Sequence, residues 1–257
     1  MFTALTFNMQ NGEPWIGPDA PPSAPDLAAT CAFLRATHAD ILFLQEVERG
    51  HDGGAQTEPP PHFAALRDGL PGYHSVFAYP PPNPDEIPFG LGLAIFSKTP
   101  LTGFWKEDLD PPDLTFEYGG RVRRPSPRLL IGARTEIQGR PLGLLNTHLQ
   151  AFFMIGASSD DHPHQRRRVL ARLAAEPRPA IAAGDFNCAP EENLLGEFAA
   201  RGFHSVLDGE ITWRRRAYSL DHIFYGSDLA LESKKILPTE SSDHHAVLAR
   251  FAFPDAR

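Results

Sequence analysis

Six short polar motifs between residues 8 and 244 carry the side chains in this sequence that are best suited to chemistry. One group offers carboxylate and amide oxygens: Asn8, Glu46, Asp185, Asn187 and Asp243. A second group offers imidazoles, His148 and His244, with Asp221 available to orient one ring. Oxygen ligands suit a hard cation such as magnesium, and imidazoles suit proton transfer. Together the two groups favour metal-assisted hydrolysis of an ester.

Each of these residues also has an ordinary structural explanation when it is taken alone. Asn8 and Asp185 stand where a strand runs into a turn, and Asx side chains at turns often bond their own backbone. A lone histidine such as His148 is more often structural than catalytic. The shared position changes this interpretation, because the polar residues repeatedly follow an apolar strand or precede one. Such strand ends meet at one rim of a mixed sheet, where pockets form.

Composition and missing motifs exclude several classes of protein. The 257 residues are 42% hydrophobic and 22% charged, as in ordinary globular proteins. A net charge of −8 disfavours a protein that coats nucleic acid, although a local basic patch could still bind it. The sequence has no Cys-X-X-Cys, no His-Glu-X-X-His, no Walker loop and no dinucleotide fingerprint. Metal binding through thiolates and the common nucleotide-binding loops are therefore not expected.

Location is predicted from the cysteines and from the apolar pattern. Cys31 and Cys188 are too few for a disulfide framework, which favours a reducing compartment. The N-terminus lacks the pattern of a signal peptide, and no stretch approaches the ~20 apolar residues of a membrane helix. We expect a cytoplasmic protein without an integral membrane segment, and the oligomeric state is left open.

The elements that must position the motifs alternate between apolar strand runs and helical patterns, which indicates a mixed α/β protein. The predicted strands are Phe2–Phe7, Asp40–Gln45, Leu91–Ser97, Arg128–Glu136, Leu142–Thr147, Ala180–Ala183, Leu220–Tyr225, Leu229–Leu237 and Ala246–Phe253. The predicted helices are Leu27–Thr37, Gln165–Ala175 and Asn193–Ala200. Gly50–Pro61 and Tyr79–Pro88 are rich in proline and glycine and are predicted as surface loops. Composition does not change across them, so we expect one domain over residues 1–257.

The ordered motifs resemble those of the endonuclease/exonuclease/phosphatase superfamily, the deoxyribonuclease I-like group. The motifs are Asn8-Met9-Gln10-Asn11, Leu44-Gln45-Glu46, Asn146-Thr147-His148-Leu149, Gly184-Asp185-Phe186-Asn187, Leu220-Asp221-His222-Ile223 and Ser242-Asp243-His244. Each motif alone is weak, but six in the family's order make a strong signal. The resemblance implies a four-layered α/β sandwich, with two mixed sheets face to face and helices outside.

The resemblance also implies a role for each residue. Glu46 would be the main ligand of a magnesium (Mg2+) or manganese (Mn2+) ion, with Asn8 and Asp243 assisting. Asp185, held by Asn187, would position and deprotonate the attacking water. His244, oriented by Asp221, would donate to the phosphoryl oxygen. His148 would stabilise the transition state or assist the leaving group. With histidine at this position, the sequence resembles the deoxyribonuclease I, sphingomyelinase and phosphatase branches more than the abasic-site endonucleases, which typically have tyrosine there.

Two further features bear on the substrate. Arg214 and Arg216 lie just before Asp221 and are predicted to bind a substrate phosphate, since arginine forks suit phosphate. The apolar run Phe152–Ile155 follows His148 and could form a wall for an apolar leaving group, although packing under the next loop is the favoured explanation. We therefore expect a metal-dependent phosphoric ester hydrolase acting on a small or lipid-like phosphoester. A nuclease acting on DNA or RNA is the alternative, and a non-catalytic binding module is the third hypothesis.

Overall fold

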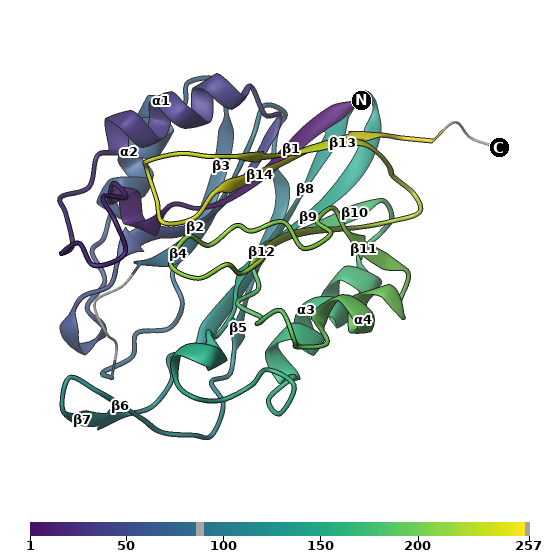
Figure 1. Cartoon of the computed structure of the whole chain (residues 1–257). Helices are drawn as coiled ribbons and strands as arrows, with labels where there is room; N and C mark the ends of the chain where they lie inside the picture. Colours follow the sequence, from purple (N-terminus) through teal and green to yellow (C-terminus); the bar gives the residue numbers. More distant parts are fainter. Residues whose placement is uncertain (86–89, 255–257) are drawn as a thin grey trace.

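In the computed structural model, which describes residues 1–85 and 90–254, two six-stranded mixed β-sheets form the body of the protein (Figure 1). Sheet A contains β1 (Phe2–Asn8), β2 (Ile41–Arg49), β3 (His74–Ala78), β4 (Gly90–Ser97), β13 (Ala230–Leu237) and β14 (Ala246–Ala252). Sheet B contains β5 (Thr102–Leu109), β8 (Arg128–Ile137), β9 (Arg140–His148), β10 (Ala180–Asp185), β11 (Phe203–Ser205) and β12 (Asp221–Gly226). The spatial orders are β13-β14-β1-β2-β4-β3 and β11-β12-β10-β9-β8-β5.

The sheets pack face to face over a shared apolar core. Ile41 and Phe43 of sheet A belong to the same buried cluster as Leu144 and Ile181 of sheet B. The central strands β1, β2, β9 and β10 are buried on both faces, which explains why they read as almost unbroken apolar runs in the sequence.

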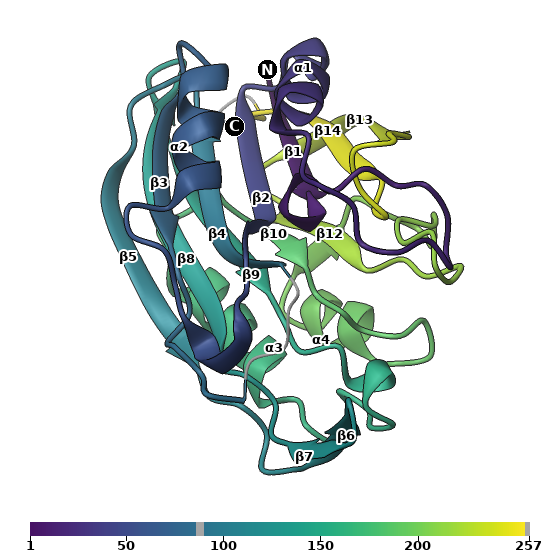
Figure 2. The same cartoon turned by 90° about the vertical axis from the view of Figure 1, so that its left-hand side faces the viewer.

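Helices cover the outer face of each sheet (Figures 1 and 2). Leu34 and Leu66 pack on the outer face of sheet A. Val169 and Phe198 do the same on sheet B. The covering helices are α1 (Leu27–Thr37) and α2 (Pro61–Gly69) on sheet A, and α3 (His164–Ala175) and α4 (Leu194–Ala199) on sheet B. The four-layered sandwich expected from the sequence is confirmed.

A pair of buried amides joins the sheets directly beneath the strand ends. Asn146 Nδ2 of β9 donates to the carbonyl oxygens of Leu44 and Ala94 in sheet A, at 2.9 Å each. Gln45 Nε2 of β2 donates back to Asn146 Oδ1 at 2.7 Å. Both side chains are fully buried. Since one strand end of each sheet is tied to the other at this level, the residues that follow Gln45 and Asn146 are held in a fixed relation.

All twelve elements predicted from the sequence are present, but the structure adds several that were not predicted. These are α2, β3, β5, β11 and a small hairpin of β6 (Phe116–Tyr118) and β7 (Arg121–Arg123). β3 and β5 lie at the edges of their sheets and are mostly exposed or half-buried, so their apolar pattern is weak. α2 begins at Pro61, where the missing N–H of proline costs nothing. Residues 86–88 of the second predicted loop lie outside the described residues.

Candidate active site

The register of sheet B places three of the predicted site residues side by side. Asp185, at the end of β10, pairs with His148 in the parallel ladder to β9. It also pairs with Asp221 in the antiparallel ladder to β12. Gly184 precedes Asp185 with a φ of +147°, and a Cβ there would lie 2.0 Å from the carbonyl oxygen of Thr147. Glycine at 184 therefore allows the close backbone approach that brings His148 and Asp185 together.

Sheet A contributes Asn8 and Glu46, and Glu46 reaches the site through an irregular backbone. The pairing of β2 with β4 shifts between Gln45 and Glu48, and Glu46 has a positive φ of 50°. Such bulges redirect side chains beside active sites, and positive φ at a non-glycine residue is backbone strain that surrounding structure must hold. A Cβ on Gly90 would lie 2.2 Å from Glu46 Oε2, so glycine at 90 leaves room for the redirected carboxylate.

The Asn8 amide connects the carboxylates of the two sheets. Asn8 Nδ2 donates to Glu46 Oε1 at 2.9 Å and to Asp185 Oδ2 at 3.0 Å. Asn8 itself is fully buried, and its Oδ1 accepts from the backbone N–H of Gln10 at 3.1 Å. One side chain therefore fixes the separation of two acidic groups that come from opposite sheets.

Asp185 lies at the centre of the cluster, with both predicted catalytic imidazoles beside it. Its Oδ2 is 3.7 Å from His148 Nε2 and 3.9 Å from His244 Nε2. Its Oδ1 accepts from the backbone N–H of Asn187 at 2.9 Å. Asn187 has a positive φ of 49°, and its Nδ2 donates to the carbonyl oxygen of Leu149 at 3.1 Å. The turn after β10 thus fixes the position of the Asp185 carboxylate through the backbone of Asn187.

Asp221 orients His244 through a short hydrogen bond. His244 Nδ1 is 2.8 Å from Asp221 Oδ2, and both residues are buried. Burial alone would lower the pKa of His244, but the Asp221 charge and hydrogen bond, with Asp185 and Asp243 nearby, raise it to about 10. The imidazole is therefore a cation at neutral pH and can act as a proton donor through Nε2.

The His148 ring is neutral, unlike that of His244, and Glu46 has a pKa close to neutral pH. Burial, the Arg128 charge and the His244 charge hold the pKa of His148 well below its usual value, so its ring is neutral. Burial, opposed by the Asn8 hydrogen bond and aided by the Asp243 charge, raises the pKa of Glu46 to about 7. Burial and the Asp221 charge also raise the pKa of Asp185.

Asp243 is held at the site by two residues that the sequence reasoning did not select. Trp213 Nε1 donates to Asp243 Oδ2 at 3.2 Å, and Arg215 Nε donates to the same oxygen at 2.6 Å. Asp243 Oδ1 lies 4.0 Å from His244 Nε2. Trp213 also forms an isolated β-bridge with His244, which brings the Trp213–Tyr218 segment against the site.

The cluster fits a divalent cation on its own chemistry. The half-buried carboxylate of Glu46 and the buried carboxylate of Asp185 have raised pKa values, and Asp221 Oδ1 is a buried oxygen without a hydrogen-bond partner among the described residues. Buried acidic oxygens in this state gain from a nearby positive ion. Asp185, Asp221 and His244 each offer a ligand atom within 4.8 Å of the others, which makes them one candidate metal site, and binding there would require the neutral imidazole of His244. Glu46, Asn8 and Asp243 border the same space, so the predicted ligands and this set share one cluster.

The cluster lies in a pocket of about 460 Å³ with apolar and basic walls. Glu46, His148, Asp185, Asn187, Asp243 and His244 line it. The aromatic and apolar walls are Phe116, Tyr118, Phe153, Met154, Ile155 and Trp213, and the arginines are Arg49, Arg124, Arg128 and Arg215. The hairpin formed by β6 and β7 and the short helix η3 (Phe152–Met154) carry several of these walls (Figure 2). The apolar run after His148 therefore borders the pocket.

The arginine cluster before Asp221 is divided between three environments. Arg215 lines the pocket and contacts Asp243. Arg214 lies beside the pocket, where it donates to the carbonyl oxygen of Thr239 and pairs with Glu240 at 3.2 Å. Arg216 stacks over Phe153, with its guanidinium carbon 5.6 Å from the ring centre. Neither Arg214 nor Arg216 lines the pocket, and because these residues lie in a turn, the sequence pattern does not separate Arg215 from its neighbours.

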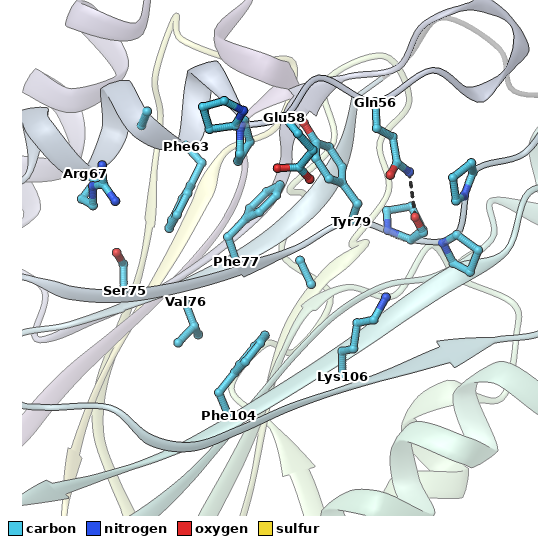
Figure 3. A pocket seen from close by; sticks show the side chains of 17 residues that line it. Gln56, Glu58, Phe63, Arg67, Ser75, Val76, Phe77, Tyr79, Phe104 and Lys106 are labelled. Atoms are coloured by element: carbon cyan, nitrogen blue, oxygen red, sulfur yellow. Dashed lines mark hydrogen bonds between the residues drawn. The ribbon is translucent and has the colours of Figure 1, made fainter.

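A second, larger groove of about 560 Å³ lies at the open edges of the sheets, where β3 and β5 have no further strand partner (Figure 3). Phe63 stacks on Phe77 there at 4.9 Å between ring centres, and Phe104 and Lys106 come from β5. The described residues that line the groove include charged side chains but no cluster of carboxylates with imidazoles. The smaller pocket, with its converging titratable groups, is therefore the candidate active site.

Comparison with known proteins agrees with this geometry. The model of the endonuclease/exonuclease/phosphatase family matches residues 5–244, which include every residue of the cluster. The chain belongs to this family. Among individual proteins, a UPF0294 protein of Vibrio vulnificus is 27% identical over 121 residues. That match covers 45% of this chain and 41% of the relative, so the chain spans less than half of that protein's length.

Solved structures of family members share the fold. An endonuclease/exonuclease/phosphatase from Beutenbergia cavernae superposes with a TM-score of 0.72 at 21% identity, over 98% of this chain and 71% of that one. The human Nocturnin catalytic domain gives 0.66 at 22% identity, over 98% and 94%. A Bacteroides thetaiotaomicron mannosyl-6-phosphatase gives 0.65 at 16% identity, over 98% and 100%. At these identities the structures establish the fold alone. The described residues contain no helix that is long and apolar enough to cross a membrane.

Proposed function

We propose that this family member is a divalent-metal-dependent phosphoesterase that hydrolyses a small or lipid-like phosphoester by in-line attack of water. The observation that carries the proposal is the Asn8 amide, which holds Glu46 of one sheet and Asp185 of the other within 3.0 Å of a single nitrogen. Acidic oxygens from two sheets therefore meet beside a neutral and a charged imidazole. This is the donor set that hydrolysis of a phosphoester needs.

Each protein group has a defined task in the proposed reaction. Asp185, held by Asn187, orients the attacking water and takes its proton. His244, charged and fixed by Asp221, donates from Nε2 to a phosphoryl oxygen, where negative charge develops. His148, neutral, stabilises the leaving oxygen from the opposite side of Asp185. Mg2+ or Mn2+, held by Glu46 with Asn8 and Asp243 beside it, would neutralise charge on the phosphoryl oxygens.

The pocket walls support the choice of a compact, partly apolar substrate. Phe153, Met154 and Trp213 offer apolar contact close to the cluster, and Arg128 and Arg215 offer charge for a phosphate. A groove-binding nuclease contacts several phosphates in a row, and the protein carries a net charge of −8. We therefore place nuclease activity second.

The buried cysteines, Cys31 and Cys188, are free, which supports a cytoplasmic location as part of the proposal.

The test of the proposed function is hydrolysis with and without metal. The purified protein is assayed with Mg2+ or Mn2+ against p-nitrophenyl phosphate, bis(p-nitrophenyl) phosphate and duplex DNA. We expect turnover of a small ester that stops in excess chelator, and only slow cleavage of DNA at moderate salt. Full activity in chelator would overturn the role of the metal. Efficient DNA cleavage with neither small ester hydrolysed would establish the nuclease instead.

A matched pair of glutamates assigns the ligand. Glu46→Gln should raise the magnesium concentration needed for half-maximal rate about tenfold or more, because a carboxylate is the stronger ligand for a hard cation. Glu48→Gln is the control: Glu48 is also buried with a pKa raised to about 7 by burial, but its Oε1 accepts from the backbone N–H of Phe63. Glu48 does not line the pocket. An equal magnesium shift in both variants would remove Glu46 from the ligand set.

A further inference from the structure

Four large apolar side chains stand exposed at the mouth of the active-site pocket or on the hairpin that borders it. They are Ile16, Tyr118, Val122 and Met154, with exposed fractions between 47% and 67%. Among the described residues, eight large apolar side chains are exposed to a comparable degree, so half of them gather at this one place. We call these four the apolar rim. Single exposed apolar residues need no explanation, but a group around an active site marks an interaction surface.

The rim comes from three separate segments that meet at the pocket. Tyr118 of the β6–β7 hairpin and Met154 of η3 line the pocket itself. Ile16 lines an adjoining depression of about 250 Å³, which shares Gln10 and Arg215 with the pocket. In Figure 2 the β6–β7 hairpin lies at the lower end of the molecule. Tyr118, Met154 and Ile16 therefore border the entrance, and Val122 lies on the other face of the same hairpin.

Each face of the hairpin carries one exposed apolar side chain near the tip, with a charged side chain opposite it in the ladder. Tyr118 pairs with Arg121 and Glu117 pairs with Val122, so Tyr118 and Val122 point to opposite faces, since side chains alternate along a strand. The turn between the strands is Gly119–Gly120, which has no side chain to hydrate. Arg121 shares a face with Tyr118, and Glu117 shares a face with Val122, so the tip suits the boundary between an apolar layer and its charged surface.

Charge around the hairpin has the opposite sign to the protein as a whole. Residues 116–124 contain three arginines and one glutamate, a sum of 3 − 1 = +2, in a chain of net charge −8. Arg124 is largely exposed, and its contact with Asp113, 3.7 Å away and almost fully exposed, is a weak surface pair. Apolar side chains interleaved with arginines suit a layer that is apolar inside and anionic at its surface.

We propose that the apolar rim docks the protein on the surface of a phospholipid bilayer, so that the pocket acts on a phosphoester presented at that surface. Docking rests on the rim alone, and the action of the pocket on a phosphoester at that surface rests on the proposed function. A bilayer fits better than a protein partner, because the rim consists of separate side chains around an opening. A protein interface of ordinary strength instead needs one continuous, closely packed area.

The experiment is flotation with lipid vesicles, of phosphatidylcholine alone and of phosphatidylcholine with 30% phosphatidylserine, in parallel with turnover of soluble bis(p-nitrophenyl) phosphate in Mg2+. We expect the protein to float with both vesicles and more strongly with the anionic ones, where about 0.5 M salt should weaken the additional binding. The variant Ile16→Asp/Val122→Asp should lose about tenfold or more of its vesicle affinity. Neither residue lines the active-site pocket, so soluble turnover should persist.

The control is Phe104→Asp/Leu195→Asp, which adds the same charges at exposed apolar residues away from the pocket mouth. Figure 3 shows Phe104 in the groove at the sheet edges. Loss of vesicle binding in this control to the same degree would overturn the choice of face. Absence of vesicle binding in the parent protein, with soluble turnover intact, would overturn the inference and leave the proposed function standing. Self-association of the parent protein, abolished by Ile16→Asp/Val122→Asp, would make the rim a subunit interface instead.

Discussion

Replacing Asn146 by leucine should destabilise the protein through the join between its two sheets. Leucine resembles asparagine in shape but cannot donate to the carbonyl oxygens of Leu44 and Ala94, both now 2.9 Å from Asn146 Nδ2. A buried polar group that loses its partner costs about 1–3 kcal/mol. Gln45 Nε2 also contacts Thr6 Oγ1 and the carbonyl oxygen of Phe43, so it retains partners. Loss of the two bonds donated by Asn146 and of the bond that it accepts from Gln45 sets the loss in free energy of unfolding at about 2–4 kcal/mol.

Urea unfolding followed by tryptophan fluorescence measures this loss, and the neighbouring residue provides the control. Thr147 is equally buried, but its Oγ1 makes a single bond, to the carbonyl oxygen of Leu129 within sheet B, at 3.0 Å. Thr147→Val should therefore cost about 1 kcal/mol. The kcat of Asn146→Leu should also fall more, because the Asn8–Asp185 contact crosses the same junction. Equal unfolding midpoints for the two variants would refute the reasoning.

Two shorter predictions concern the site, and a third concerns His222, which does not line the pocket. Asp185→Asn and His244→Ala should each lower kcat by about 10²–10⁴-fold. Asp221→Asn should lower kcat by less, because it leaves the imidazole in place. An unchanged kcat in Asp221→Asn would show that Asp221 does not act by orienting His244. Gly90→Ala should raise the magnesium requirement, since its Cβ displaces the Glu46 carboxylate, and titration of rate against magnesium measures this. Burial lowers the pKa of His222 to about 4, so the unfolded chain binds the proton first, and stability should fall by about 3 kcal/mol as pH drops from about 6.5 to 4. Thermal unfolding of His222→Phe should show a smaller loss over that pH range.

The fold could be predicted because its central strands are buried on both faces. β2, β9 and β10 are nearly continuous apolar runs, and short turns follow them, so their polar termini stood out from the sequence. The edge strands β3 and β5 were missed because their side chains are mostly exposed or half-buried and their apolar pattern is weak, whereas the edge strand β13 was predicted. Burial therefore made the same elements both predictable and able to carry the site.

The finer parts of the site depended on contacts that a linear pattern does not contain. Arg214, Arg215 and Arg216 are chemically identical in the sequence, and only the fold directs Arg215 into the pocket while Arg216 stacks on Phe153. The bulge at Glu46 is equally hidden, because the residue reads as the last position of a regular strand. Long-range packing decided both, so neither spacing nor residue type could predict them.

Two histidines beside one carboxylate carry opposite charge states, and this division assigns their chemistry. His148 Nε2 and His244 Nε2 lie 3.7 Å and 3.9 Å from Asp185 Oδ2. Only His244 has a carboxylate, Asp221, hydrogen-bonded to its other nitrogen, and this raises its pKa to about 10. Burial and the Arg128 charge instead keep His148 neutral. Because environments that push such pKa values apart separate donor from acceptor, His244 can give a proton to an oxygen next to Asp185 while His148 cannot compete for that task.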